Sequence, residues 1–268
     1  GKKDQLNYMW RRDASQWANS APILFPIVGA LKNDTCVING KEYHMTQHGF
    51  ARHNEFETNQ VSDTEVIFSL KSNDEIIKQY PFLFELNVTY RLVENKLTCH
   101  IEVKNTDHQP IYFQVGGHPA FACPFMENES SNDYYLEFSE NETCNRKIID
   151  VEKRGMSRVE KPFFDNEKRF FVRQELFNTD AIVIKKFKSE NIALKSLNHD
   201  KSIVFHMNGF DHVGLWAAKH VGGLIAIEPW VGHADYTDFN GEFKEKESCV
   251  ELPVGKNFEV EFAVEINQ

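Results

Sequence analysis

Apolar residues that recur at every second position dominate this chain, and they constrain its fold more than any other feature of the sequence. Between Phe82 and Tyr90, the residues Phe84, Leu86 and Val88 continue the alternation and give one apolar face. Similar short runs are separated by Asn, Asp, Gly and Lys, of which the first three are typical of turns. We expect strands within residues 66–70, 82–105, 111–117, 134–138, 169–173, 181–187, 191–197, 202–207, 212–218, 223–230 and 257–266.

Turn and helix signals complete this pattern. Asn39-Gly40 lies between two short apolar runs, which is a strong signal for a two-residue hairpin turn, and Glu94-Asn95 marks a second hairpin tip. Residues 73–80 are expected to form two helical turns that begin at a polar cap and end before a proline. Residues 13–21 are expected to form another short helix.

The sequence shows no fixed repeat, no low-complexity tract and no linker rich in Pro, Gly or Ser. The segment 125–165 is the most polar and is expected to hold long loops. Residues 1–268 are therefore expected to form a single domain of the all-β class, a large antiparallel β sandwich with few short helices.

Charge and composition limit the classes of binding partner and the cellular compartment that we expect for this protein. A net charge of -10 argues against nucleic acid, whose phosphates would repel the protein. No Lys/Arg-rich block indicates an anionic membrane, no apolar run reaches the length of a span, and no signal peptide opens the chain, so we expect a cytoplasmic protein. Five scattered cysteines fit free thiols in a reducing compartment. The polar start without an initiator methionine suggests that one or two strands precede Gly1.

Residues 47–57, QHGFARHNEFE, concentrate two histidines, an arginine and two glutamates. On a strand, His48 and Arg52 would share one face, while His53 and the two glutamates would take the other and meet solvent or salt-bridge partners. The spacing is not that of HExxH, and Arg52 would place a fixed charge beside a cation, so we expect no metal here. The planar fork of Arg52 suits oxygen acceptors instead.

Two further polar residues interrupt apolar strands. Glu228 ends the run IAI, and burial against Trp230 would raise its pKa to a range that suits a proton carrier. The alternative is a surface ion pair at a strand end. His118 follows two glycines that allow the backbone to bend or to approach a ligand. Its imidazole is either a proton carrier near neutral pH or a hydrogen-bonded core residue.

The aromatic content bears on the ligand class. Trp10, Trp17, Trp216 and Trp230 can supply flat walls that stack on sugar rings, or they can fill the core of a sandwich together with 22 phenylalanines. No phosphate loop, dinucleotide fingerprint or GxSxG elbow is present. Trp230, beside Glu228, is the candidate for a wall of a binding pocket.

Four motifs in this order resemble those of the aldose 1-epimerase (galactose mutarotase) family, and in particular its LacX-like bacterial branch. The motifs are FPIVG (25–29), QHGFAR (47–52), GGHPAF (116–121) and IEPWVG (227–232). The resemblance covers nearly the whole chain and implies a large antiparallel β supersandwich. It also implies an isomerase that interconverts the α and β anomers of a hexose by acid–base ring opening and reclosure, with a small-molecule sugar as substrate and neither metal nor cofactor.

The resemblance also implies a role for each site residue. Glu228 is the general base that takes the proton from the C1 hydroxyl, and His118 is the general acid that protonates the ring oxygen. His48 and Arg52 bind sugar hydroxyls or the ring oxygen. Asp180, in LFNTDAIVI, is the best candidate for an aspartate that binds sugar hydroxyls. One acid and one base on opposite sides of a pyranose are sufficient for this reaction.

The chain departs from the family at one motif, and two alternatives stay open. FPIVG is commonly followed by Arg in the family, but Ala30 stands there in this chain. A hexose-6-phosphate mutarotase is one alternative, with Arg11, Arg12 and Lys32 as candidate phosphate contacts, although the acidic net charge favours a neutral sugar. A non-catalytic carbohydrate-binding or sensing protein is the other. The sequence leaves the physiological sugar and the oligomeric state open.

Overall fold

The computed structural model describes residues 2–3, 6–218 and 223–267. Strands make up most of these ranges, and every pairing between the named strands within them is antiparallel, which confirms the all-β prediction. The strands are β1 (Lys2–Lys3), β2 (Leu6–Asn7), β3 (Ile23–Leu24), β4 (Thr35–Ile38), β5 (Lys41–His44), β6 (Glu57–Ser62), β7 (Glu65–Lys71), β8 (Phe84–Val93), β9 (Lys96–Asn105), β10 (Ile111–Phe113), β11 (Val115–Gly117), β12 (Ala120–Cys123), β13 (Tyr134–Asp150), β14 (Gly155–Phe171), β15 (Ile182–Lys185), β16 (Asn191–Ser196), β17 (Ser202–Asn208), β18 (His212–Trp216), β19 (Gly223–Val231), β20 (Val250–Leu252) and β21 (Asn257–Asn267).

Helices are short. The α-helix α1 (Asp74–Ile77) begins at Asn73, whose side-chain oxygen accepts bonds from the backbone of Glu75 and Ile76, so the predicted cap is confirmed but the helix is one turn long. The 3₁₀ turns are η1 (Lys32–Asp34), η2 (Ala51–His53), η3 (Ser131–Asp133), η4 (Gln174–Phe177) and η5 (Phe243–Glu245).

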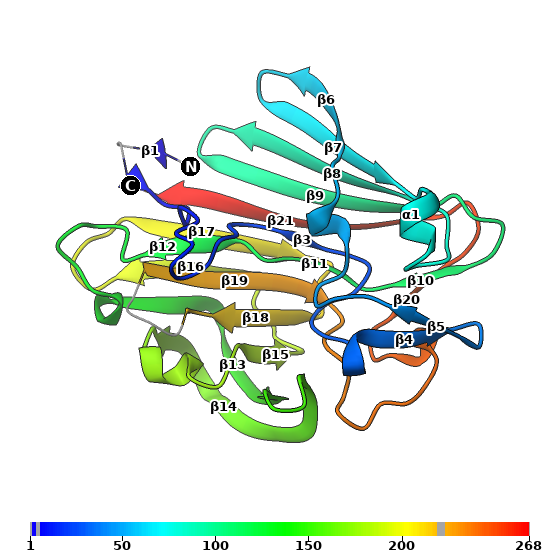
Figure 1. Ribbon diagram of the computed structural model, residues 1–268. Helices are drawn as coiled ribbons and strands as arrows, with labels where there is room; N and C mark the ends of the chain where they lie inside the picture. The colour runs from blue at the N-terminus through cyan, green and yellow to red at the C-terminus, as the bar shows by residue number, and fades with distance from the viewer. Residues whose placement is uncertain (1, 4–5, 219–222, 268) are drawn as a thin grey trace.

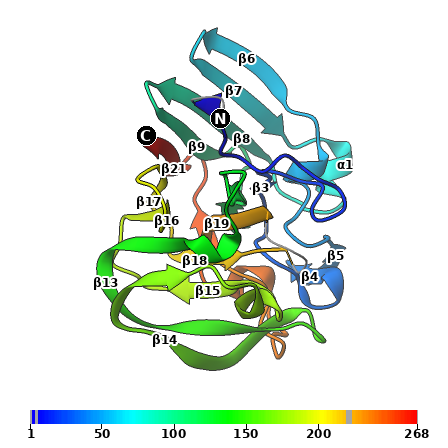
Figure 2. The same cartoon turned by 90° about the vertical axis from the view of Figure 1, so that its left-hand side faces the viewer.

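One large sheet holds most of the strands, in the order β3-β11-β19-β18-β15-β13-β16-β17-β21-β9-β8-β7-β6. β12 pairs with β19 beside this path, and β14 pairs with β13. Figure 1 shows β6 to β9 and β21 in the upper part of the molecule, with β13 to β15 and β18 in the lower part, and Figure 2 shows the bend of the sheet between them. Fully buried aromatic side chains, including Phe25, Phe84, Phe113 and Phe205, fill the core.

The predicted hairpins are confirmed, and their turn residues explain them. Asn39 and Gly40 have φ values of 51° and 74° between β4 and β5, as a two-residue turn of this kind requires. Glu94 has φ 52° between β8 and β9. The apolar alternation from Phe82 to Val88 points into the core, where all four of its members are buried.

The predicted helix over 13–21 is wrong. The chain makes a single turn there, in which the backbone N–H groups of Gln16 and Trp17 donate to the carbonyl of Asp13. The Asp13 carboxylate accepts from both the backbone and the hydroxyl of Ser15 and so caps this turn, whereas the Trp17 carbonyl accepts from the Trp10 indole N–H instead of continuing a helix. The turn carries the side chain of Trp17 toward the interior.

The long loops expected within 125–165 are also wrong, because this segment forms most of the hairpin β13–β14. Most residues of β14 are exposed, and the regular alternation of β13 ends after Phe138, so much of the hairpin lacks the pattern that identifies a half-buried strand. Several register shifts bend the hairpin along its length. Its turn, at residues 151–154, reaches back over the sheet.

Two expectations from composition bear on the whole chain. All five cysteines are free thiols, as predicted, and Cys36, Cys99 and Cys123 are buried. Among the helices that the structure describes, none has the length and apolar character needed to cross a bilayer.

Candidate active site

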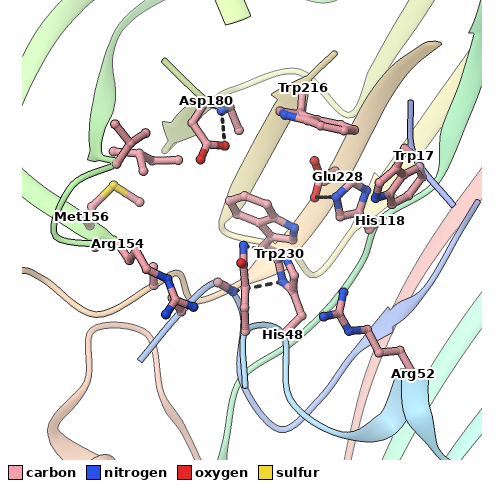
Figure 3. Close-up of a pocket in the computed structure, with 18 residues that line it drawn as sticks. Trp17, His48, Arg52, His118, Arg154, Met156, Asp180, Trp216, Glu228 and Trp230 are labelled. Carbon is pink, nitrogen blue, oxygen red and sulfur yellow. Dashed lines mark hydrogen bonds and ion pairs between the residues drawn. The ribbon is translucent and has the colours of Figure 1, made fainter. Parts of the chain in front are cut away.

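A cavity of about 350 Å³ opens over the strands β11, β18 and β19, and the turn of the β13–β14 hairpin forms part of its wall. Its lining includes all six residues predicted from the sequence: His48, Arg52, His118, Asp180, Glu228 and Trp230. Figure 3 shows these side chains converging from segments that lie far apart in the sequence. The structure therefore brings the candidates together in one place.

The register between neighbouring strands places His118 opposite Glu228. Gly116 pairs with Trp230 on one side and Ala120 pairs with Ala226 on the other, and the same antiparallel register runs through the positions between them. Across this register, Nε2 of His118 lies 3.3 Å from a carboxylate oxygen of Glu228. Glu228 lies inside β19, so the expectation of a strand end is wrong. The two side chains thus touch each other inside the cavity.

Burial controls the protonation of this pair. Glu228 is 2% exposed, and its burial raises its pKa well above the usual range, with the nearby Asp180 carboxylate adding to the effect. Burial lowers the pKa of His118 to about 3, and the Arg52 guanidinium acts in the same direction. Burial thus disfavours the charged form of both side chains. The alternative interpretation of Glu228, a surface ion pair at a strand end, is excluded because the side chain is buried.

Aromatic rings surround the His118 imidazole. Trp17 stacks on it with ring centroids 4.6 Å apart and an interplanar angle of 26°, and Trp216 meets it edge-on at 5.8 Å. Trp10 lies behind them, and its indole N–H donates to the carbonyl of Trp17. The four tryptophans thus fall into two groups. Trp17, Trp216 and Trp230 line the cavity, whereas Trp10 packs in a neighbouring hydrophobic cluster.

His48 is fixed by Gly29. Its backbone N–H donates to the Gly29 carbonyl at 2.9 Å, and its Nδ1 accepts from the Gly29 N–H at 3.1 Å. Because Nδ1 is an acceptor, the proton of the neutral ring sits on Nε2. Burial, with His118 and Arg52 nearby, lowers the pKa of His48 well below its usual value. The ring is thus a neutral hydrogen-bond donor.

The strand expected over residues 47–57 is wrong. The chain turns at Gly49 with φ +72°, and a Cβ there would lie 2.3 Å from the Phe25 carbonyl oxygen, so a glycine is needed. That carbonyl accepts from the backbone N–H groups of two residues at the start of η2, which docks this turn on the FPIVG segment. His48 and Arg52 reach the cavity from the turn. The exposed side chains of His53 and of Glu55 and Glu57 agree with the prediction that they meet solvent.

Arg52 and Asp180 lie on different walls (Figure 3). Arg52 is half-buried, its Nε donates to His53 at 3.2 Å, and burial lowers the pKa of its guanidinium. Asp180 follows η4 with φ 128°, and its carboxylate accepts from the backbone of Ala181 at 2.7 Å. The cavity thus presents a guanidinium and a carboxylate in addition to the Glu228–His118 pair.

Trp230 is wedged between glycines on the two strands beside its own. A Cβ on Gly116 would lie 2.8 Å from its Cδ1, and a Cβ on Gly214 would lie 2.6 Å from its Cη2. A Cβ on Gly117 would lie 2.7 Å from the Phe262 ring. The glycines before His118 therefore make room for aromatic side chains.

Arg154 lines the cavity and was missed in the sequence. It lies in the turn of the β13–β14 hairpin and makes two bonds to the Asp34 carboxylate, at 2.9 and 3.0 Å. No sequence signal marked it, because its segment was expected to be a loop. Ala30, which departs from the family pattern, also lines the cavity.

The basic residues offered as phosphate contacts lie elsewhere. Arg11, Arg12 and Lys32 are absent from the lining of this cavity. Arg12 donates to the carbonyl of Ala18 at 3.0 Å, and Lys32 donates to the side chain of Asn240 at 2.6 Å. They give no support to a phosphate site.

Possible metal ligands meet away from the cavity. Among the residues that the structure describes, His212, His233 and Glu247 have ligand atoms within 4.8 Å of one another. Lys185 bonds to Glu247, and Lys147 lies 3.9 Å from it, so ammonium groups already neutralise this carboxylate. We assign no metal to this group.

The comparisons with known proteins agree with the fold and the motifs. The family model described as aldose 1-epimerase matches residues 1–251. The plasmid-encoded protein LacX of Lactococcus lactis subsp. lactis is 36% identical over 244 residues, which cover 86% of this chain and 79% of the relative.

Solved structures of similar proteins share the supersandwich. A galactose mutarotase related enzyme from Lactobacillus acidophilus has a TM-score of 0.92 and 31% identity, over 97% of this chain and 87% of that one. A galactose mutarotase-like protein from Lactobacillus casei has a TM-score of 0.91 and 28% identity, over 98% of this chain and 90% of that one. These similarities confirm the predicted fold and family: the chain belongs to the aldose 1-epimerase family.

Proposed function

We propose that this protein interconverts the α and β anomers of free hexoses. The observation that carries the proposal is the contact between His118 and Glu228 at 3.3 Å inside the cavity. The two oxygens that exchange protons during ring opening, the C1 hydroxyl and the ring oxygen, are bonded to the same carbon. An acid and a base in contact with each other can therefore act on both oxygens together.

The proton count of the pair is conserved through the cycle. Hydroxyl groups of a bound sugar donate to the Glu228 carboxylate and favour its ionised form, which moves the shared proton to His118. Glu228 then takes the proton of the C1 hydroxyl while His118 protonates the ring oxygen and the C1–O5 bond breaks. After rotation about C1–C2 the open-chain aldehyde recloses on its other face, and both protons return.

The remaining cavity residues hold the sugar in this scheme. The neutral His48 and the Arg52 guanidinium donate to sugar oxygens, and the Asp180 carboxylate accepts from hydroxyls. Trp230 offers an apolar face to the C–H groups of the ring. No step requires a metal or a cofactor.

Polarimetry on freshly dissolved α-D-galactose and α-D-glucose tests the proposal. We expect the protein to accelerate the approach to anomeric equilibrium in proportion to its concentration, after subtraction of the spontaneous rate. Unchanged rates across a panel of hexoses and their 6-phosphates would refute catalysis. Saturable binding of a sugar without acceleration would identify a carbohydrate-binding or sensing protein instead.

The hexose-6-phosphate alternative rests on Arg154, a second guanidinium in the lining. Two of its five N–H groups donate to Asp34, so its charge is already paired with a carboxylate that would repel a phosphate. The structure therefore favours a neutral sugar, and the same panel decides the matter. A kcat/KM for the 6-phosphates well above that for the free hexoses would reverse this preference.

We expect kcat/KM to be flat across neutral pH. The pair is active with one proton; it gains a second only as the pH falls toward the depressed pKa of His118, about 3, and it loses the last only as the pH rises through the raised pKa of Glu228. The acidic and alkaline limbs of the bell-shaped pH profile of kcat/KM therefore lie further from neutral pH than the ordinary pKa values of histidine and glutamate would place them. Rates measured by polarimetry from acid to alkaline pH check this, and a fall on the acid side near pH 6.5, the ordinary value for histidine, would contradict it.

A further inference from the structure

Arg154 faces the cavity from the turn of the β13–β14 hairpin, and the proposed proton exchange does not use it. Figure 3 shows its guanidinium on the far side of the Trp230 indole from His118. Its Nη1 and Nη2 atoms donate to the two oxygens of the Asp34 carboxylate, at 2.9 and 3.0 Å. Since a guanidinium has five N–H groups, these two bonds leave three N–H groups for another acceptor. The side chain is 55% exposed, so the protein does not enclose these donors.

Local structure fixes the position of this guanidinium. Arg154 has φ 52° and Asp34 has φ 56°, so both adopt the left-handed conformation, which is costly for residues other than glycine and is frequent at ligand-binding sites. A Cβ on Gly155 would lie 2.9 Å from the Asp235 carbonyl oxygen, so the chain packs directly on that segment. The backbone N–H of Met156 donates to the same carbonyl at 2.7 Å. The turn is thus held by its backbone as well as by the ion pair, and its donors are preorganised for a ligand.

The geometry of a pyranose indicates which atoms meet this end of the cavity. The Glu228–His118 pair acts on the two oxygens bonded to C1, so the C1–O5 bond lies against that pair. The ring bond opposite C1–O5 is C3–C4, and its hydroxyls therefore point away from the pair, toward Arg154. Because Asp34 already pairs with the charge of Arg154, the remaining N–H groups suit the oxygen of a neutral hydroxyl.

We propose that Arg154, oriented by Asp34, determines sugar specificity by donating a hydrogen bond to a hydroxyl on the C3–C4 edge of the reacting ring. This inference rests on the proposed mutarotase function. Neither of these hydroxyls takes part in ring opening, so the bond has the same strength in the bound sugar and in the transition state. It therefore lowers KM and leaves kcat unchanged. Asp34 does not touch the sugar and is a positioning residue.

NMR exchange spectroscopy at anomeric equilibrium tests the proposal with glucose and galactose and with their 3-deoxy and 4-deoxy derivatives as probes. We expect at least one deoxy derivative to have a KM about tenfold or more above that of its parent hexose, the usual effect of a lost hydrogen bond to a charged group, with a similar kcat. Equal KM values for parents and derivatives would overturn the role of Arg154 and leave the mutarotase function intact. Turnover of none of these sugars would refute the mutarotase function, and this proposal with it.

Arg154→Met removes the donors and keeps most of the length of the side chain. We expect the variant to raise KM for the parent hexose about tenfold and to leave KM for the affected deoxy derivative within about twofold of wild type, because the hydroxyl that Arg154 binds is already missing from the derivative. Equal increases for parent and derivative would mean that the side chain shapes the wall without binding a hydroxyl, which contradicts the proposal.

Arg158→Met is the matched control. Arg158 lies on β14 of the same hairpin, its side chain is 60% exposed, and it pairs with Asp238 at 3.1 Å, but it is absent from the lining of the cavity. This variant removes an equivalent ion pair and should leave every KM within about twofold of wild type. An increase equal to that of Arg154→Met would assign the effect to a loosened hairpin and overturn the proposal.

Asp34→Asn tests the positioning role. The amide keeps the shape of the carboxylate but weakens the bonds that orient the guanidinium, so we expect KM for the parent hexose to rise about threefold. In the Arg154→Met background the same substitution should change KM by less than about twofold, because no guanidinium is left to orient. Independent, multiplying increases in the double variant would contradict the positioning role of Asp34.

Discussion

Glu228→Gln is expected to lower kcat for hexose mutarotation by about two to four orders of magnitude, the usual size for a lost general base. The amide has nearly the shape of the carboxyl group but cannot take a proton from the C1 hydroxyl. Because burial disfavours the ionised form of Glu228, the neutral amide is also expected to leave stability almost unchanged. Polarimetry at saturating sugar, corrected for the spontaneous reaction, measures the loss.

Glu142→Gln is the matched control for this variant. Glu142 is also 2% exposed, but it accepts from Ser189 and from the Lys188 backbone and is absent from the cavity lining. It should leave kcat within about twofold, although the loss of its bonds lowers stability. Wild-type turnover in Glu228→Gln would show that another group takes the proton.

His118→Asn is expected to have a loss of similar size, about two to four orders of magnitude in kcat, because the amide cannot protonate the ring oxygen. The double variant with Glu228→Gln should be little worse than either single variant, since each substitution alone breaks the same proton exchange. Double-variant kinetics by polarimetry and NMR exchange check this. Additive losses would mean that the two side chains act in separate steps.

His206→Asn is the control for His118→Asn. His206 lies on β17, contacts Glu265 at 3.1 Å, and is absent from the cavity lining. It is expected to keep kcat within about twofold of wild type. A comparable loss in this variant would point to a general effect on folding, and circular dichroism with a urea titration separates that case from a catalytic one.

Local patterns in the sequence were sufficient for much of the fold. Strict alternation identifies strands such as β8, where one face is buried, and Asn39-Gly40 identifies its hairpin because both residues adopt positive φ. The ends of the β13–β14 hairpin, at 134–138 and 169–173, were predicted as strands, but its middle escaped prediction because most of β14 is exposed and the alternation of β13 ends after Phe138. The turn at 13–17 escaped because it does not continue into a helix: the Trp17 carbonyl accepts from the Trp10 indole, a tertiary contact that no local pattern reveals.

The motifs predicted which residues belong to the candidate site, but they did not predict how those residues are arranged. His118 and Glu228 are 110 residues apart in the chain, and only the register between β11, β12 and β19 places them opposite each other. Trp17 and Arg154 entered the site from a turn and a hairpin whose structures the sequence did not reveal. Long-range pairing of this kind is not encoded in any single local pattern.

The position of the Trp230 indole has a consequence for how proteins of this architecture diverge. Two neighbouring strands carry no side chain where they meet that ring, at Gly116 and Gly214, and so they set how far it recedes. A methyl group at either position would clash with the indole and force the ring or the strands to shift. The depth of the cavity is thereby adjustable from the two strands beside Trp230, at positions that lie on the same face of the sheet as the indole but outside the cavity lining.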